Sequence, residues 1–174
     1  EGLKSREYRE RIRAANGLED IGSPAAGAAR AICVATLDSN SDVQKAALDA
    51  LRSIRRDLYP LVLVLLADND DRRVVESLFA LEDLGQVAEP ASPVVAVVLL
   101  RESTKDQRRR RAKVCTAGLE CLFRLAPDDE SLILPLDELC ASADSEFFRG
   151  FAIRHLGKIG ELKPTTRRSI LAIL

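Results

Sequence analysis

The sequence predicts an all-α protein: a right-handed α-solenoid of about five antiparallel helix pairs in one domain spanning residues 1–174. Three observations lead to this prediction. The apolar content of 47% is carried mostly by Ala, Leu, Val and Ile, whereas aromatic residues make up 4% and Trp is absent. A short apolar pattern with helical periodicity recurs along the chain, and a Pro follows each copy. Small and aliphatic residues in recurring helical units are typical of stacked repeats.

The repeat is visible when five Leu residues are placed in register. They are separated by 33, 30, 41 and 34 residues: Leu18, Leu51, Leu81, Leu122 and Leu156. A period in this range is the signature of supersecondary units that stack on one another. The repeats are expected at about 7–39, 40–69, 70–104, 105–143 and 144–174.

The first helix of each unit, helix A, is predicted around the shared Leu. A small residue and two large aliphatic residues recur at i, i+3 and i+4 spacing, which places them on one helix face. The segments that carry this pattern lie at 14–22, 46–54, 77–85, 117–125 and 152–160. Gly ends three of them, at Gly22, Gly85 and Gly160, and Gly is the common residue just after a helix.

A returning helix, helix B, is predicted after each helix A because a Pro interrupts the chain there. Pro is tolerated in the first turn of a helix and cannot continue the preceding one. These residues are Pro24, Pro60, Pro90, Pro135 and Pro164. The B helices are expected at 25–37, 58–67, 92–100, 131–141 and 165–174. Asp and Ser in the turns after them suit the N-terminal caps of the next helix A.

The repeat pattern resembles the short bacterial type of HEAT-like repeat that was first associated with phycobilisome lyases. It is clearest in Asp42-Val43-Gln44, followed by Ala47, Ala50-Leu51 and Ile54, and again in Phe148-Arg149, followed by Ala152 and Ile159-Gly160. The Ile-Gly ending is replaced by Ile54-Arg55 and by Leu125-Ala126 in two copies. The resemblance covers residues 8–174 and implies an armadillo-like superhelix that serves as a protein-binding scaffold.

Enzyme members of the HEAT-like class are less consistent with the residues. The DNA glycosylases of this class use Trp residues in a basic groove, and this chain has no Trp and a net charge of -1. The di-iron hydroxylases need repeated His-Glu pairs, and the chain has one His, His155. Nothing singles out a catalytic group for lyase chemistry on bilin pigments. No nucleotide-binding, zinc-protease or serine-hydrolase motif is present either, so the chain is predicted to be non-enzymatic and without a cofactor.

The cysteines are predicted to be small hydrophobic side chains of helices. Cys33, Cys115, Cys121 and Cys140 form no CxxC pair, and one His is too few to complete a standard zinc site. Reduced thiols favour a cytoplasmic location. The apolar runs are too short to span a bilayer, so no membrane insertion is expected. The chain contains no Met and begins at Glu1, and we expect it to be a piece of a longer repeat array or a processed product.

The candidate partner-binding site is a basic segment in the fourth repeat. Residues 101–113 contain seven basic and two acidic residues, whereas 127–146 contain seven acidic and no basic ones. The residues singled out are Arg108, Arg109, Arg110, Arg111 and Lys113. The long spacing of 41 residues places an insertion here, and insertions in repeat proteins form loops on one face. A solvated loop is the favoured interpretation, and binding of phosphate or acidic peptide is the alternative.

The function predicted from these observations is protein–protein recognition through a shallow concave face made by the B helices. The alternative is nucleic-acid binding through the basic segment 101–113, which steep salt dependence would indicate. An enzyme is the third choice. The single His155 and the acidic run Asp128-Asp129-Glu130 are interpreted as structural or solvated groups, and the sequence makes no prediction of the oligomeric state.

Overall fold

The computed structural model of the protein describes residues 1–103 and 111–126. Throughout these ranges the secondary structure is helical, without a strand, which confirms the predicted all-α class. The α-helices are α1 Tyr8–Ile21, α2 Ala29–Ala35, α3 Ser41–Ile54, α4 Tyr59–Ala67, α5 Asp71–Leu84, α6 Ser92–Ser103 and α7 Arg111–Leu125. The short 3-10 helices are η1 Gly2–Lys4, η2 Ser23–Ala28 and η3 Gly85–Ala91.

The first three A helices share one length and one register. α1, α3 and α5 each contain 14 residues, and Leu18, Leu51 and Leu81 each lie ten positions after the first residue of their helix. Leu51 and Leu81 are fully buried, whereas Leu18 is partly buried at the outer side of the core. The spacing read from the sequence therefore corresponds to equivalent places in three successive helices.

The turns before α3 and α5 repeat the same hydrogen bonds. Asn40 caps α3 and Asp70 caps α5, each accepting the backbone N–H two residues further on at 2.9 Å. Asp38 and Asp68 lie two residues before these caps, and each accepts the N–H of its cap residue at 2.9 Å. Such side chains satisfy donors that a helix start leaves without a partner, which explains why both helices begin where they do.

Glycine with positive φ ends two of the A helices. Gly22 follows α1 with φ 66°, and Gly85 follows α5 with φ 60°. After each glycine the chain enters a 3-10 helix before helix B starts. The predicted B helix at 25–37 is therefore an α-helix only from Ala29 onward. Gly27 in this stretch has low helix propensity, and 3-10 turns are common at helix starts.

The other two described B helices agree more closely with the prediction. α4 begins within one residue of the expected start and ends at Ala67, as expected. α6 begins at Ser92 and continues three residues beyond the expected end, to Ser103. α7 begins at Arg111, so the last part of the predicted basic insertion is helical.

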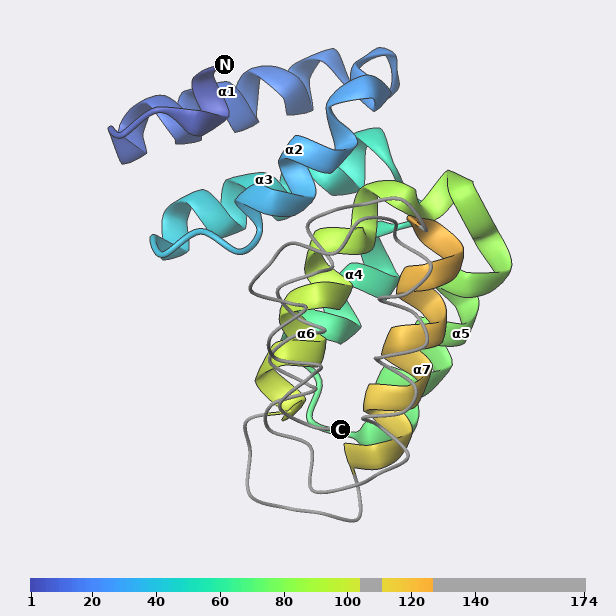
Figure 1. Ribbon diagram of the computed structural model, residues 1–174. Helices are drawn as coiled ribbons and strands as arrows, with labels where there is room; N and C mark the ends of the chain where they lie inside the picture. The colour runs from blue at the N-terminus through green and yellow to red at the C-terminus, as the bar shows by residue number, and fades with distance from the viewer. Residues whose placement is uncertain (104–110, 127–174) are drawn as a thin grey trace, which may run out of the picture.

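The helices pack in pairs, and the A helices form two parallel pairs, α1 with α3 and α5 with α7. The end of α3 meets the end of α1, where Ser53 Oγ donates to the Glu19 carbonyl at 3.0 Å. The end of α7 meets the end of α5 through an ion pair between Arg124 and Glu82 at 3.1 Å. Each helix B packs most closely on the helix A that follows it, as α2 does on α3, α4 on α5 and α6 on α7. Figure 1 shows α1, α2 and α3 lying across one end of the more upright helices α4 to α7.

The stacking changes direction between the second and third helix pairs. α3 lies along α1, but α3 and α5 share little contact. Instead, α2 packs against η3 and α6, and Arg30 of α2 forms an ion pair with Glu89 of η3. The two parallel pairs, α1 with α3 and α5 with α7, are thus joined through B helices and η3.

One apolar core runs through most of the described helices. Its largest fully buried side chains are Ile32, Leu51, Leu58, Leu65, Leu78, Leu81, Leu99, Leu119, Leu122 and Leu125. Gly118 lets α7 approach its neighbours closely, since a Cβ there would lie 3.6 Å from Leu99 Cδ1 and 4.0 Å from Leu78 Cδ1. α7 therefore packs on both α5 and α6.

Candidate functional site

The predicted basic site is described only in part. Arg108, Arg109 and Arg110 lie outside the described residues, and Arg111 is the first residue of α7. Lys113 is exposed in the first turn of α7. Of the five predicted side chains, the structure therefore places that of Lys113.

Lys113 borders a pocket of about 810 Å³ at the start of α5. The described lining residues are Asn69, Asp70, Asp71, Arg72, Val75, Glu76 and Lys113. The lining joins the α4–α5 turn, the first turns of α5 and the start of the parallel neighbour α7. Because α5 and α7 start side by side, Lys113 reaches the same pocket as Arg72, although it lies 41 positions further along the chain.

Ion pairs fix the orientation of the two arginines that follow the α5 cap. Arg72 Nε donates to Glu76 Oε1 at 2.8 Å, one helical turn further on. Arg73 Nη1 lies 2.8 Å from Asp68 Oδ2, so it returns to the turn before the helix. Glu76 holds the pKa of Arg72 above its ordinary value through this hydrogen bond. Both arginines are exposed, and such pairs contribute little stability.

Asp71 is the polar group of this pocket that lacks a partner. Its Oδ2 is buried and accepts no hydrogen bond from the residues that the structure describes. Asp71 is also the first residue of α5, where the positive end of the helix dipole favours a carboxylate. The helix start therefore offsets part of the cost of burying this oxygen.

The described lining of the pocket is mostly charged. Its described lining offers three carboxylates and two cationic groups around one apolar side chain, Val75. No His, Cys or hydroxyl side chain is among the lining residues that the structure describes. A cationic or neutral hydrogen-bonding group fits this lining better than a phosphate does, because the carboxylates around Lys113 repel anions.

Arg101, the first residue of the basic segment, makes structural contacts. It lies near the end of α6, and its Nη2 and Nη1 donate to the carbonyls of Leu65 and Leu66 at 3.3 and 3.4 Å. These carbonyls belong to the last turn of α4, where carbonyl groups have no donor within their own helix. Glu102 pairs with Arg101 Nε at 3.1 Å. Part of the basic charge counted from the sequence thus holds α6 against α4.

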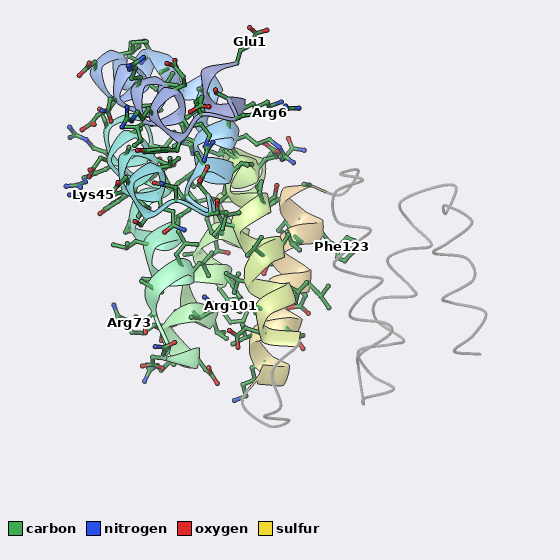
Figure 2. All side chains as sticks on the ribbon, turned by 90° about the vertical axis from the view of Figure 1, so that its left-hand side faces the viewer. Glu1, Arg6, Lys45, Arg73, Arg101 and Phe123 are labelled. Carbon is green, nitrogen blue, oxygen red and sulfur yellow. The ribbon has the colours of Figure 1, made fainter. Side chains whose placement is uncertain are left out.

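Apolar side chains are exposed on two of the three described B helices. Val34 in α2 is 51% exposed and Val97 in α6 is 41% exposed. α4 lines a shallower hollow of about 500 Å³ with Leu63, Val64 and Ala67. Figure 2 shows the side chains of the described residues, with Arg73 at the outer margin of the lower half and Arg101 nearer its middle.

Three of the four cysteines are described, and within that part of the chain all three are buried and form no disulfide: Cys33, Cys115 and Cys121. Burial raises the pKa of the Cys33 and Cys121 thiols to about 12. A thiol that stays protonated is a poor nucleophile and a poor metal ligand. The prediction that these cysteines act as small hydrophobic side chains is confirmed for these three.

Several residues singled out from the sequence lie outside the described ranges: Cys140, His155 and the acidic run 128–130. Among residues 1–103 and 111–126, no group of three or more His, Cys, Asp or Glu side chains is arranged to hold a metal ion. No helix within the same part of the chain has both the length and the apolar character needed to cross a membrane.

The sequence did not reveal the pocket at the start of α5. An Asp in the turn before this helix is predicted to cap it, and Asp70 does so. The pocket arises because α7 starts beside α5, and the 41-residue spacing does not indicate where α7 begins. The one available signal was the repeat itself, since successive A helices of a stack lie parallel.

Comparison with protein-family models and with curated proteins finds no significant match to the chain.

Proposed function

We propose that the chain is a HEAT-like solenoid scaffold that binds a protein partner through the exposed face of its B helices and catalyses no reaction. The observation that carries this proposal is the exposure of Val34 on α2 and Val97 on α6. Solvent-exposed aliphatic side chains on well-packed helices form the kind of surface that a protein partner buries.

The shared register of α1, α3 and α5 supports the repeat part of the proposal. Three equal helices with equivalent Leu positions and two matching caps indicate one structural unit used repeatedly. The change of direction between α3 and α5 adds a bend to the proposed superhelix, and the contact of α2 with α6 brings two B helices together there.

The test is an affinity pull-down from the native source extract at low and high salt, with matched variants of the bait. Val34→Glu with Val97→Glu places charge on the B helices. Tyr8→Glu with Phe79→Glu does the same on A helices, where these side chains are 38% and 48% exposed. We expect a specific protein to be retained at both salts by the wild type and the A-helix variant, and lost with the B-helix variant.

Two results would contradict the proposal. Equal loss with both variants would remove the B helices as the binding face. Retention of nucleic acid alone, at low salt only, with loss after replacement of residues 108–111 by Ser, would favour the alternative of nucleic-acid binding through the segment 101–113. The carboxylates beside Lys113 and the structural contacts of Arg101 make this alternative the less supported one.

A further inference from the structure

Three exposed aliphatic side chains lie at or just after the ends of the A helices α1 and α5. Ile21 at the end of α1 is 56% exposed, Leu84 at the end of α5 is 36% exposed, and Val87 in η3 is 61% exposed. We call these three residues the apolar edge. In Figure 1 the ends of α1 and α3 and the α5–η3 corner all lie on the right-hand side.

Hydrogen bonds make this edge continuous from α1 to η3. Ser53 Oγ at the end of α3 donates to the carbonyl of Glu19 in α1 at 3.0 Å. Arg55, just after α3, donates from Nη2 to the carbonyl of Val87 at 2.9 Å. Asp57 holds the Arg55 guanidinium in place with two further bonds, of 2.9 and 2.7 Å. The apolar side chains are therefore displayed on fixed backbone.

Unpaired carboxylates flank the apolar edge. Glu19 and Asp20 lie in the last turn of α1, and Asp83 lies in the last turn of α5. All three are exposed, and within the described part of the chain they form no ion pair. Neither last turn contains a basic residue. The exposed Arg56 nearby supplies one positive charge against these three negative ones.

The position of these carboxylates opposes the helix dipole. The end of an α-helix carries negative partial charge, so Asp and Glu in the last turn destabilise it, whereas Lys or Arg stabilise it. Two of the three A-helix ends that the structure describes along this edge carry the unfavourable charge. These carboxylates lower the stability of both helix ends and create a negative potential around the exposed aliphatic side chains. Residues that lower stability in this way are common at functional surfaces.

We infer that the apolar edge docks a basic amphipathic helix of a partner protein. Aliphatic side chains of that helix would cover Ile21, Leu84 and Val87, while its Lys or Arg residues lie beside Glu19, Asp20 and Asp83. Charge complementarity selects this occupant, because an acidic or neutral apolar segment gains nothing from the carboxylates. The apolar edge is separate from the B-helix face of the proposed function and does not depend on it.

The test measures binding of a fluorescein-labelled amphipathic helical peptide of Leu and Lys by anisotropy, with a Leu and Glu peptide as the charge control. We expect the full chain to bind the Leu/Lys peptide alone. Ile21→Ser with Val87→Ser should weaken binding by about tenfold or more, since each side chain would be buried in the complex. Matched changes elsewhere, Phe79→Ser and Asp42→Asn with Glu120→Gln, should leave the affinity unchanged.

A second variant separates binding from folding. Asp20→Lys with Asp83→Lys should weaken peptide binding but raise the melting temperature by about 2–4 °C, because both helix ends gain a favourable charge. A lower melting temperature would show that these carboxylates serve the fold. That result, absence of wild-type binding, binding of both peptides alike, or equal loss in the matched controls would overturn the inference.

Discussion

Arg11 and Asp38 form two parallel hydrogen bonds, from Nε to Oδ2 at 2.7 Å and from Nη2 to Oδ1 at 2.9 Å. Only 14% and 12% of their side chains are exposed. Arg11 Nη1 also donates to the Ser5 carbonyl at 2.8 Å. This arrangement joins the start of α1 to the turn before α3. A two-point arginine–carboxylate pair that is largely buried is stronger than an ordinary surface ion pair.

Asp38→Asn should lower stability in a pH-dependent way. The hydrogen bonds from Arg11 hold the pKa of Asp38 below its ordinary value of 3.8. The ion pair therefore stabilises the fold above the pKa of the unfolded chain, and this contribution is lost as the pH falls through the folded pKa. At pH 7 we expect the variant to lose about 1–3 kcal/mol of unfolding free energy.

Chemical denaturation of both proteins from pH 7 down to about pH 3 checks this prediction. The difference between wild type and variant should shrink below about pH 4. Asp42→Asn, at an exposed position nearby, is the control and should not reproduce the trend. A constant difference across the whole range would contradict the assignment to Asp38 ionisation.

Leu51→Ala should destabilise the protein more than Leu18→Ala. The two residues occupy the same position of α3 and α1, but Leu51 is fully buried while Leu18 is only partly buried. Truncation at Leu51 leaves a cavity, and we expect a loss of about 2–5 kcal/mol in unfolding free energy. The loss at Leu18 should be smaller because water already reaches that side chain. Equal losses in urea denaturation would show that burial does not set the difference.

Alanine at Gly85 and at Gly17 should change stability in opposite directions. A Cβ at either position meets no atom within 4 Å, so crowding plays no part. Gly85 has φ 60°, which an Ala side chain disfavours, and we expect Gly85→Ala to cost about 1–3 kcal/mol. Gly17 lies inside α1, where Ala gains about 1 kcal/mol of helix propensity. Thermal denaturation followed by circular dichroism reports both signs.

Cys33 and Cys121 should resist alkylation in the folded protein. Both are fully buried, and burial raises the pKa of each thiol to about 12, so neither forms thiolate at pH 8. Iodoacetamide treatment followed by peptide mass spectrometry should find both unmodified in buffer and modified in guanidinium chloride. Rapid modification of the native protein would contradict the packing described for α2 and α7.

The helices were predictable because local rules determine them. The position of Leu51 and Leu81 follows from i, i+3 and i+4 spacing, and the caps at Asn40 and Asp70 follow from the polar turns. The turn after Gly22 was less predictable, since an Ala-rich stretch starting at Pro24 suits both α and 3-10 geometry.

The arrangement of the helices and the candidate site depended on contacts between residues far apart in sequence. Nothing near Arg30 in the sequence indicates its partner Glu89, 59 residues away, yet that pair accompanies the change of stacking direction. The charge of Arg101 could be counted from the sequence, but its role against the end of α4 could not. Lys113 was expected in a solvated loop but lies in the first turn of α7, and the pocket beside it depends on the neighbouring helix α5.

The sparse contact between α3 and α5 has a consequence for how the chain unfolds. In a repeat protein, cooperativity is transmitted between nearest neighbours. Here it passes mainly from α2 to η3 and α6, where Arg30, Glu89 and Ser92 meet, with a smaller share through α4 and the Arg55–Val87 hydrogen bond. We therefore expect backbone amides of α1 and α3 to exchange with solvent through openings that leave α5 to α7 intact.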